Sequence, residues 1–396
     1  MHNYFLLFFL LLSTVFSADL KITQTHKGSK AGTIDGKPFL YLTGTHYERG
    51  YAMGFLAAKE ILIGINGYVY PIFKMRGAPL TNRGIKYMTG SMHWDERFET
   101  EMKGILDGIK AALKDPKERL ILAKDREISL VDIKLLNCLP DWASAGCSSF
   151  VRSGDQTKDG KMIIGRNLDY PMTPAMLKCQ YIIASQPTEK DLKPTLNMSW
   201  VGIVGSLTTI NSDGVFMAIH DAKGLARDNS VKAYHPRMLA LRQSIEGASQ
   251  ENSLNHFQKS LESKPPRVGN NILVVAPEKN EFAVFEWDSN AKSNGVTVRK
   301  GKDRIDCTNH FNVRFTKTNY AWSIKRLTYL TGHTTKVDIE AAKDMLRNVS
   351  NSTTAHSVVY HPASGNIHYA YPDKAGASAA KCKWYTVKWT DFFPEK

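Results

Sequence analysis

Cys147 stands in residues 145–150 (AGCSSF), where a helical pattern gives way to a strand-like one. Arg166 and Asp169 follow in residues 165–171 (GRNLDYP). A cysteine attacks as its thiolate, and because the pKa of a free thiol is about 8.5, a nearby cation and a base both help it. Arginine can hold the thiolate by its charge, and a carboxylate can accept a hydrogen bond from an ammonium group. These residue types would suit covalent catalysis by a cysteine nucleophile, although Cys147 could instead be half of a disulfide.

The sequence between the two groups predicts a β-hairpin. Residues 147–153 and 161–169 are β-like, and residues 155–160 between them are rich in turn-forming types. In a hairpin the second strand runs back along the first. We therefore expect Arg166 and Asp169 to lie beside the start of the first strand.

The rest of the chain predicts one α+β domain with helices grouped between strands. The part before Cys147 is mainly helical, and we expect Pro140 to end the last of its helices. The predicted helices are residues 45–61, 94–114, 130–139, 236–247, 251–263, 320–329 and 339–349. Beyond the hairpin, the predicted strands are residues 180–185, 196–203, 206–210, 215–219, 271–276, 282–287, 356–360 and 367–371.

Residues 1–17 are typical of a secretory signal peptide. Residues 4–12 (YFLLFFLLL) are apolar but too short to span a bilayer, and Val15 and Ser17 suit the −3 and −1 positions of a cleavage site. No later run is long and apolar enough to cross a membrane. We expect the mature protein in the secretory pathway, either lysosomal or extracellular. Three glycosylation sequons support this expectation, at Asn197, Asn348 and Asn351.

An odd number of cysteines leaves at least one thiol unpaired within the monomer. The five are Cys138, Cys147, Cys179, Cys307 and Cys382. If Cys147 is the nucleophile, the other four allow two disulfides with three possible pairings, or Cys138 or Cys179 is simply buried. Their spacing matches no zinc site, and we expect no metal and no cofactor.

The chain is basic, with 52 Lys and Arg against 38 Asp and Glu and a formal net charge of +14. The basic residues are spread along the sequence, and no nucleic-acid-binding motif accompanies them, so we expect no nucleic-acid partner. An anionic lipid surface or matrix is the partner that this charge favours.

The Cys…Arg-Asn-x-Asp arrangement resembles the cysteine N-terminal-nucleophile (Ntn) hydrolases. It is shared by choloylglycine hydrolase and penicillin V acylase, and by acid ceramidase and its N-acylethanolamine amidase relatives. Residues 44–54 (GTHYERGYAMG) look more like the isopenicillin-N acyltransferase group. Further similar segments follow in family order: 209–214 (TINSDG), 270–275 (NNILVV), 308–311 (TNHF), 323–327 (SIKRL) and 356–360 (HSVVY). The resemblance spans nearly all of the chain after the signal.

This resemblance implies an αββα four-layer sandwich and self-cleavage between Gly146 and Cys147. The new α-amine of Cys147, with a pKa of roughly 7.7–8.0, would act as the base for its own thiol. After the signal, the chain would consist of a mainly helical propeptide or small subunit, residues 18–146, and a catalytic large subunit, residues 147–396. The length of the first piece favours the ceramidase-like and acyltransferase-like branches.

The resemblance also implies roles for the charged residues. Arg166 would hold the thiolate and the intermediate, Asp169 would orient the new ammonium, and Arg326 matches a supporting arginine. The residues alone leave other interpretations open. Arg166 and Asp169 could form an ordinary surface ion pair, and Arg326 could be a solvated residue of its helix.

Asn211 and Asn271 match the family's asparagine positions, which would donate to the oxyanion, with Asn270 as the register alternative to Asn271. Asn211 could instead make a turn, and Asn271 could simply begin a strand. His310 is a candidate base, although the implied mechanism needs no histidine. The neighbours His220 and Asp221 would point to opposite faces of a strand and so not form a dyad.

We therefore expect attack of Cys147 on a linear amide, with transfer of the acyl group to water through a thioester. N-acylated lipids or amino acids are the leading substrate class. The first alternatives are phospholipase-B-like hydrolysis of lipid esters and acyl transfer to an amine. The alternative of another class is a non-catalytic secreted glycoprotein.

Overall fold

The computed structural model describes residues 19–75, 81–142, 145–222, 231–290, 295–314 and 320–393. The predicted signal peptide, residues 1–17, lies outside the described residues. Within the described part, no single helix is long and apolar enough to cross a membrane. Only two consecutive helical stretches, His46–Leu56 and Ala58–Met75, pass such a test together, and they are bent by 83° relative to each other.

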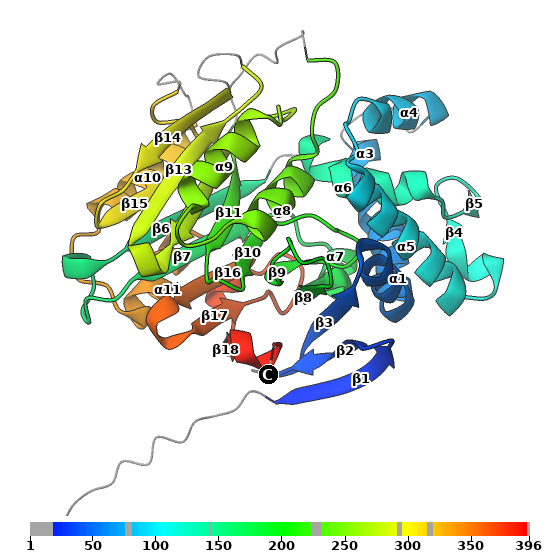
Figure 1. Cartoon of the computed structure of the whole chain (residues 1–396), viewed down its shortest axis with the longest axis horizontal. Coiled ribbons are helices and arrows are strands. Elements are labelled where there is room, and N and C mark those ends of the chain that lie inside the picture. Colours follow the sequence, from blue (N-terminus) through cyan, green and yellow to red (C-terminus); the bar gives the residue numbers. More distant parts are fainter. Residues whose placement is uncertain are drawn as a thin grey trace, which may run out of the picture.

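Two stacked β-sheets form the centre of the molecule (Figure 1). The larger sheet has the strand order β1-β2-β3-β8-β9-β10-β11-β12-β13-β14, and the smaller sheet has the order β15-β6-β7-β16-β17-β18. The larger sheet comprises β1 (Leu20–His26), β2 (Ser29–Ile34), β3 (Lys37–Gly44), β8 (Gln180–Pro187), β9 (Thr195–Trp200), β10 (Thr208–Asn211), β11 (Phe216–Asp221), β12 (Asn270–Ala276), β13 (Glu281–Trp287) and β14 (Val296–Lys300). The smaller comprises β6 (Gly146–Arg152), β7 (Ile163–Asp169), β15 (Arg304–Cys307), β16 (Thr354–His361), β17 (Asn366–Ala370) and β18 (Trp384–Lys388). Two short strands, β4 (Leu120–Ile121) and β5 (Arg126–Glu127), pair separately.

Helices cover the outer face of each sheet. The helices are α1 (His46–Leu56), α2 (Ala58–Gly64), α3 (Tyr70–Met75), α4 (Asn82–Gly90), α5 (Glu96–Ala112), α6 (Leu130–Trp142), α7 (Pro174–Cys179), α8 (Arg237–Gly247), α9 (Ser253–Glu262), α10 (Ala321–Gly332) and α11 (Ile339–Asn348). One apolar core joins the larger sheet to the helices before α10, a second lies between the sheets, and a third joins the smaller sheet to α10 and α11. These layers are the αββα sandwich that the family resemblance implied, whereas the sequence pattern alone indicated only an α+β domain.

The segment before Cys147 is less helical than the sequence indicated. Residues 20–44 form three strands, and β3 pairs in parallel with β8 of the later part, from Phe39 opposite Ile182 to Gly44 opposite Pro187. The apolar periodicity that begins at Thr45 predicts helices. The strands before it are short and partly exposed, so they lack a clear apolar pattern in the sequence. The two predicted pieces of the chain therefore share one sheet.

The sequence predicts that Pro140 ends its helix, but this prediction is wrong. Helix α6 continues through Pro140 to Trp142. Later side chains satisfy the carbonyl groups of its last turn. The Arg237 guanidinium donates to the Pro140 carbonyl, and Arg267 donates to the Asp141 carbonyl at 3.0 Å. These long-range partners are not visible in the local sequence.

Helices α1 and α5 pack backbone to backbone. A Cβ atom on Gly50 would lie 2.0 Å from the Glu101 carbonyl oxygen, and one on Gly104 would lie 2.3 Å from the Tyr47 carbonyl oxygen. Only glycine allows this approach. It places Glu101 of α5 against the first turns of α1.

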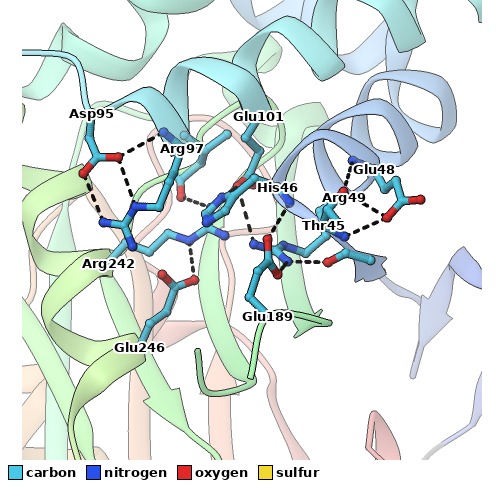
Figure 2. Close-up of polar contacts among 12 residues, drawn as sticks. Thr45, His46, Glu48, Arg49, Asp95, Arg97, Glu101, Glu189, Arg242 and Glu246 are labelled. Carbon is cyan, nitrogen blue, oxygen red and sulfur yellow. Dashed lines mark hydrogen bonds and ion pairs between the residues drawn. The ribbon is translucent and has the colours of Figure 1, made fainter. Parts of the chain in front are cut away.

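A buried ion cluster lies at this junction (Figure 2). Glu101 accepts from Arg242 at 2.8 Å and lies 2.7 Å from His46 Nδ1. Arg242 also pairs with Glu246 at 2.8 Å. Arg49 pairs with Glu189 at 2.8 Å. We call Arg49, Glu101, Glu189, Arg242, Glu246 and His46 the ion cluster. All of them except the partly exposed Glu189 are buried, and the cluster joins residues from both sides of Cys147.

Candidate active site around Cys147

Strands β6 and β7 form the antiparallel hairpin that the sequence predicts. Gly146 lies opposite Asp169, Cys147 opposite Leu168, and Ser149 opposite Arg166. Opposed residues of an antiparallel pair share a face of the sheet, and the face alternates along each strand. Cys147 and Arg166 therefore face the larger sheet, whereas Asp169 faces the opposite side, toward α10.

Cys147 is 1% exposed and lines a mostly apolar cavity. Residues before and after Cys147 both contribute to the wall, among them Tyr68, Leu136, Met176 and Trp200. Burial raises the pKa of the Cys147 thiol, and the charge of Arg166 opposes that rise. Arg166 is thus the group that favours the reactive thiolate.

Arg166 is fully buried, so it is not part of a surface ion pair. Its Nε donates to Thr208 Oγ1 at 3.4 Å, and Nη2 donates to the Ile219 carbonyl. Among the described residues, its Nη1 has no hydrogen-bond partner, and no carboxylate lies within ion-pair distance of this guanidinium. Its charge is therefore available to the Cys147 thiol.

The Asp169 side chain lies next to Gly146, the residue before Cys147. Its Oδ2 would be 2.9 Å from a Cβ atom on residue 146, so glycine is the residue that fits. Arg326 Nη1 pairs with the same carboxylate at 2.5 Å, and Thr354 Oγ1 donates to it at 2.7 Å. The structure therefore brings Arg326 to Asp169, and neither of the two is simply solvated.

Asn309 is the site residue that sequence reasoning missed. The Cys147 backbone N–H donates to Asn309 Oδ1 at 2.6 Å. Asn309 Nδ2 donates to the Asp221 carbonyl at 2.6 Å and to the Ala145 carbonyl at 3.4 Å. Residues 308–311 had been noted as a similar segment, but that similarity assigned no role to Asn309.

Asp221 and Arg237 hold the other end of the same segment. The Asp221 carboxylate accepts from the Ala145 N–H and pairs with Arg237. Asn270 Oδ1 accepts from Arg237 at 2.7 Å. Asn271 and Asn270 were alternative candidates for the same family asparagine position. Asn270 is the one linked to the Cys147 cavity, because it contacts Arg237, which lines that cavity. The backbone from Ala145 to Cys147 is held on both sides of the Gly146–Cys147 bond.

The other predicted site residues do not join this group. Asn211 donates to the carbonyls of Ile245 and Ala248 at 2.9 and 2.8 Å and accepts from backbone N–H groups of its own turn. Asn271 Nδ2 donates to the carbonyls of Thr308 and His310, so it supports the loop that carries Asn309. His310 Nδ1 lies 2.8 Å from Ser323 Oγ.

His220 and Asp221 point to opposite faces, as expected. His220 lies between the sheets with Nε2 2.7 Å from Ser149 Oγ, whereas Asp221 reaches Arg237. The two residues form no dyad.

The three sequons differ in exposure. Asn197 is buried in β9, and its Nδ2 donates to the Gly205 carbonyl at 2.9 Å, so this fold has no room for a glycan there. Asn348 and Asn351 are exposed. The prediction of glycosylation at Asn197 is therefore wrong, because an Asn-x-Ser pattern does not record burial.

All five cysteines are free thiols, and the four that were expected to pair or be buried form no bridge. Cys138, Cys179 and Cys307 are buried, and burial raises the pKa of each. Within the described ranges, no group of three or more His, Cys, Asp or Glu side chains is arranged to hold a metal ion.

Comparison with known proteins places the chain in a family. The model of the acyl-coenzyme A:6-aminopenicillanic acid acyl-transferase family matches residues 156–383, more than half of the chain. An uncharacterized protein of Archaeoglobus fulgidus is 25% identical over an alignment of 231 residues, which covers 54% of this chain and 38% of that protein. The chain thus spans well under half the length of this curated relative.

Solved structures of three enzymes are also similar to the chain. The Caenorhabditis elegans N-acylethanolamine-hydrolyzing acid amidase ortholog is 19% identical with a TM-score of 0.43, covering 61% of this chain and 100% of that one. A conjugated bile acid hydrolase mutant from Clostridium perfringens is 11% identical with a TM-score of 0.41, covering 62% and 93%. Penicillin V acylase from Agrobacterium tumefaciens is 10% identical with a TM-score of 0.41, covering 62% and 86%.

The family match includes Arg166, Asp169, Asn309 and Arg326, and it begins shortly after Cys147. It confirms the resemblance to Ntn enzymes that the sequence segments indicated. The chain belongs to the acyl-coenzyme A:6-aminopenicillanic acid acyltransferase family of Ntn enzymes.

Proposed function

We propose that this protein is a self-processing amidase of the secretory pathway, lysosomal or extracellular, that cleaves linear amides of N-acylated lipids or amino acids. The observation that carries the proposal is the setting of Cys147. Its thiol lines an apolar cavity beside the unpaired Arg166, and its backbone nitrogen is held by Asn309 at 2.6 Å. The nucleophilic thiol, the cation that favours its thiolate, and the fixed peptide bond before it are therefore all found at Cys147.

The first reaction would be on the chain itself. The Cys147 sulfur attacks the Gly146 carbonyl, the peptide C–N bond breaks, and the nitrogen takes the proton lost by the thiol. Water then hydrolyses the Gly146 thioester, which frees the thiol and leaves a carboxylate on Gly146. The segment is suited to this step because Asp221 and Asn309 fix the residues on either side of Gly146.

The second reaction would use the new amine of Cys147 as base. With a pKa of roughly 7.7–8.0 this amine can accept the thiol proton. The Asp169 carboxylate, which lies next to Gly146, can accept a hydrogen bond from the resulting ammonium group. The thiolate attacks the substrate carbonyl, the amine leaves with a proton, and water releases the acid from the thioester. The apolar wall of the cavity supports a fatty or otherwise apolar acyl group.

Acyl transfer is the second candidate, and the family match favours it. It uses the same thioester, with an amine in place of water. Ester hydrolysis of phospholipids needs no change of nucleophile, but no feature of the site selects it. An anionic lipid surface remains a proposed partner, based on the net charge of +14.

Mass spectrometry of the deglycosylated, reduced protein tests the first step. Wild type incubated at acidic and at neutral pH should give fragments 18–146 and 147–396, while Cys147→Ala stays whole. An intact wild-type chain at both pH values, with Cys147 unreactive, would favour the non-catalytic glycoprotein. Incubation with N-acylethanolamines, N-acyl amino acids and phospholipids, with and without an added amine, then separates amidase, esterase and transferase.

A further inference from the structure

Arg166 differs from the other fully buried arginines of the described chain. Arg49 pairs with Glu189, Arg152 with Asp306, and Arg237 with Asp221. A buried charge without a counter-ion is costly unless neutral polar groups surround it. For Arg166 these groups are the Ile219 carbonyl and the Thr208 hydroxyl.

Thr208 connects Arg166 to a buried histidine. Its Oγ1 lies 2.8 Å from His356 Nε2, and His356 is completely buried. A guanidinium can only donate, so Thr208 Oγ1 accepts from Arg166 and keeps one O–H and a second lone pair with which to bond His356 Nε2. Whichever of the two atoms donates, this bond fixes the orientation of the Thr208 hydroxyl.

The charge balance around Arg166 favours a neutral His356 ring. Burial, together with the charge of Arg166, holds the pKa of His356 well below its usual value. His220 and Ser149, the residue opposite Arg166, form a second pair of a histidine and a hydroxyl group. His220 Nε2 lies 2.7 Å from Ser149 Oγ, and His220 Nδ1 lies 3.1 Å from the Asn271 carbonyl. A carbonyl only accepts, so Nδ1 of His220 carries a proton. Burial and the charge of Arg166 hold the pKa of His220 well below its usual value, so this ring is neutral as well.

We propose that Thr208 and His356 are positioning residues that fix the unpaired guanidinium of Arg166 so that its charge serves Cys147. This relay of hydrogen bonds runs from Arg166 on β7 of the smaller sheet to Thr208 on β10 of the larger sheet. It then returns to His356 on β16 of the smaller sheet, so it links the two sheets. The proposal rests on Cys147 being the nucleophile of the proposed function. It adds that the cation is held by neutral partners, because a carboxylate in their place would cancel its effect on the thiol.

The rate of Cys147 alkylation by iodoacetamide as a function of pH tests the proposal, followed by mass spectrometry of the Cys147 peptide. Thr208→Val keeps the shape but removes the hydroxyl. We expect the apparent pKa of the Cys147 thiol to rise by about one unit, which is about a tenfold slower reaction at neutral pH. Thr208→Ser restores the hydroxyl and should restore the profile.

Thr209→Val is the matched control. Thr209 is the next residue of β10, is equally buried, and donates to Asn197 Oδ1 at 3.0 Å instead of contacting Arg166. Its profile should equal that of wild type. The other charged and titratable groups that act on Cys147, namely Asp169, Asp221, Arg237 and Cys307, are unchanged in all variants.

His356 provides an independent variant if Thr208→Val fails to fold. His356→Leu removes the hydrogen-bond partner of Thr208, and we expect a smaller shift in the same direction. Identical profiles for wild type, Thr208→Val and His356→Leu would overturn the proposal. Because alkylation needs neither cleavage nor substrate, a shifted profile in a protein that cleaves no amide would leave the relay standing and reject the proposed function instead.

Discussion

The ion cluster of Figure 2 and the surroundings of Arg166 are two ways of burying an arginine. In the ion cluster, Arg242 meets Glu101 and Glu246 at 2.8 Å each, so its charge is matched on both sides. Arg166 meets only a hydroxyl and a carbonyl group, and none of the described carboxylates pairs with it, although each of the two arginines keeps one nitrogen without a hydrogen-bond partner. A matched charge serves the fold, whereas an unmatched charge is free to act on a thiolate or an oxyanion.

The two regions also differ in what they connect. The ion cluster crosses the predicted cleavage point, with His46, Arg49 and Glu101 before it and Glu189, Arg242 and Glu246 after it. The Arg166 site lies wholly within the later part of the chain. We therefore expect changes in the ion cluster to affect stability and changes near Arg166 to affect chemistry.

Replacing each arginine by methionine should give the sharpest contrast. Arg242→Met leaves Glu101 and Glu246 buried without their cation, and we expect a loss of about 3–5 kcal/mol in the free energy of unfolding. Arg166→Met removes a charge that has no carboxylate partner, so we expect a loss of no more than about 2 kcal/mol, from the freed Ile219 carbonyl. Urea denaturation measures both.

Cleavage and substrate turnover should show the reverse order. Arg166→Met should lose both activities, and Arg242→Met, where it folds, should keep them. Equal losses of stability in the two variants would contradict the distinction between matched and unmatched arginines.

The pH dependence of stability provides a second test of the ion cluster. Burial alone would raise the pKa of Glu101, but Arg242 and the other partners lower it to about 2, from an ordinary value near 4.5. A carboxyl group with a lowered folded pKa stabilises the protein above its unfolded pKa and loses that contribution as pH falls through the folded value. Glu101 should thus contribute about 3 kcal/mol that disappears between pH 4.5 and 2.

Glu101→Gln should therefore be less stable than wild type at neutral pH and should lose less stability on acidification. Glu96→Gln, an exposed change on the same helix, is the control and should stay within about 0.5 kcal/mol of wild type. Parallel pH profiles for Glu101→Gln and wild type would show that Glu101 is not the group responsible.

Two asparagines test the boundary of the site. Asn309→Ala removes the acceptor of the Cys147 N–H, and we expect cleavage at Gly146 to slow by at least about tenfold, equivalent to about 1.4 kcal/mol. Asn211→Ala removes only bonds within a turn and to the end of α8, so it should lower stability without slowing cleavage. A time course by mass spectrometry distinguishes them, and a slower cleavage in Asn211→Ala alone would restore the sequence-based assignment.

The sequence predicted what local pattern and order can determine. The β6–β7 hairpin followed from two β-like runs and a turn, and it correctly placed Arg166 and Asp169 beside Cys147. The choice among asparagines failed to follow, because Asn211, Asn271 and Asn309 all stand in polar, turn-like or strand-start segments. Only the distance from Asn309 to the Cys147 nitrogen identifies it.

Long-range partners account for the other differences. The ion cluster was not predicted, since Glu101 and Arg242 are remote in sequence and each is ordinary in its own helix. Asn197 was predicted to be glycosylated because a sequon does not reveal that its strand lies inside a sheet. Arg326 was singled out only through the family resemblance, since its helix also carries exposed residues, and the structure shows it paired with Asp169.

The pairing of β3 with β8 has a consequence for producing the protein. Residues 147–396 expressed alone would leave β8, an apolar strand from the middle of the larger sheet, as an open edge with unpaired N–H and C=O groups. Open apolar edges recruit strands from other molecules, so this fragment should aggregate. For the proposed cleavage before Cys147, this means that the full chain folds first and is cut only afterwards.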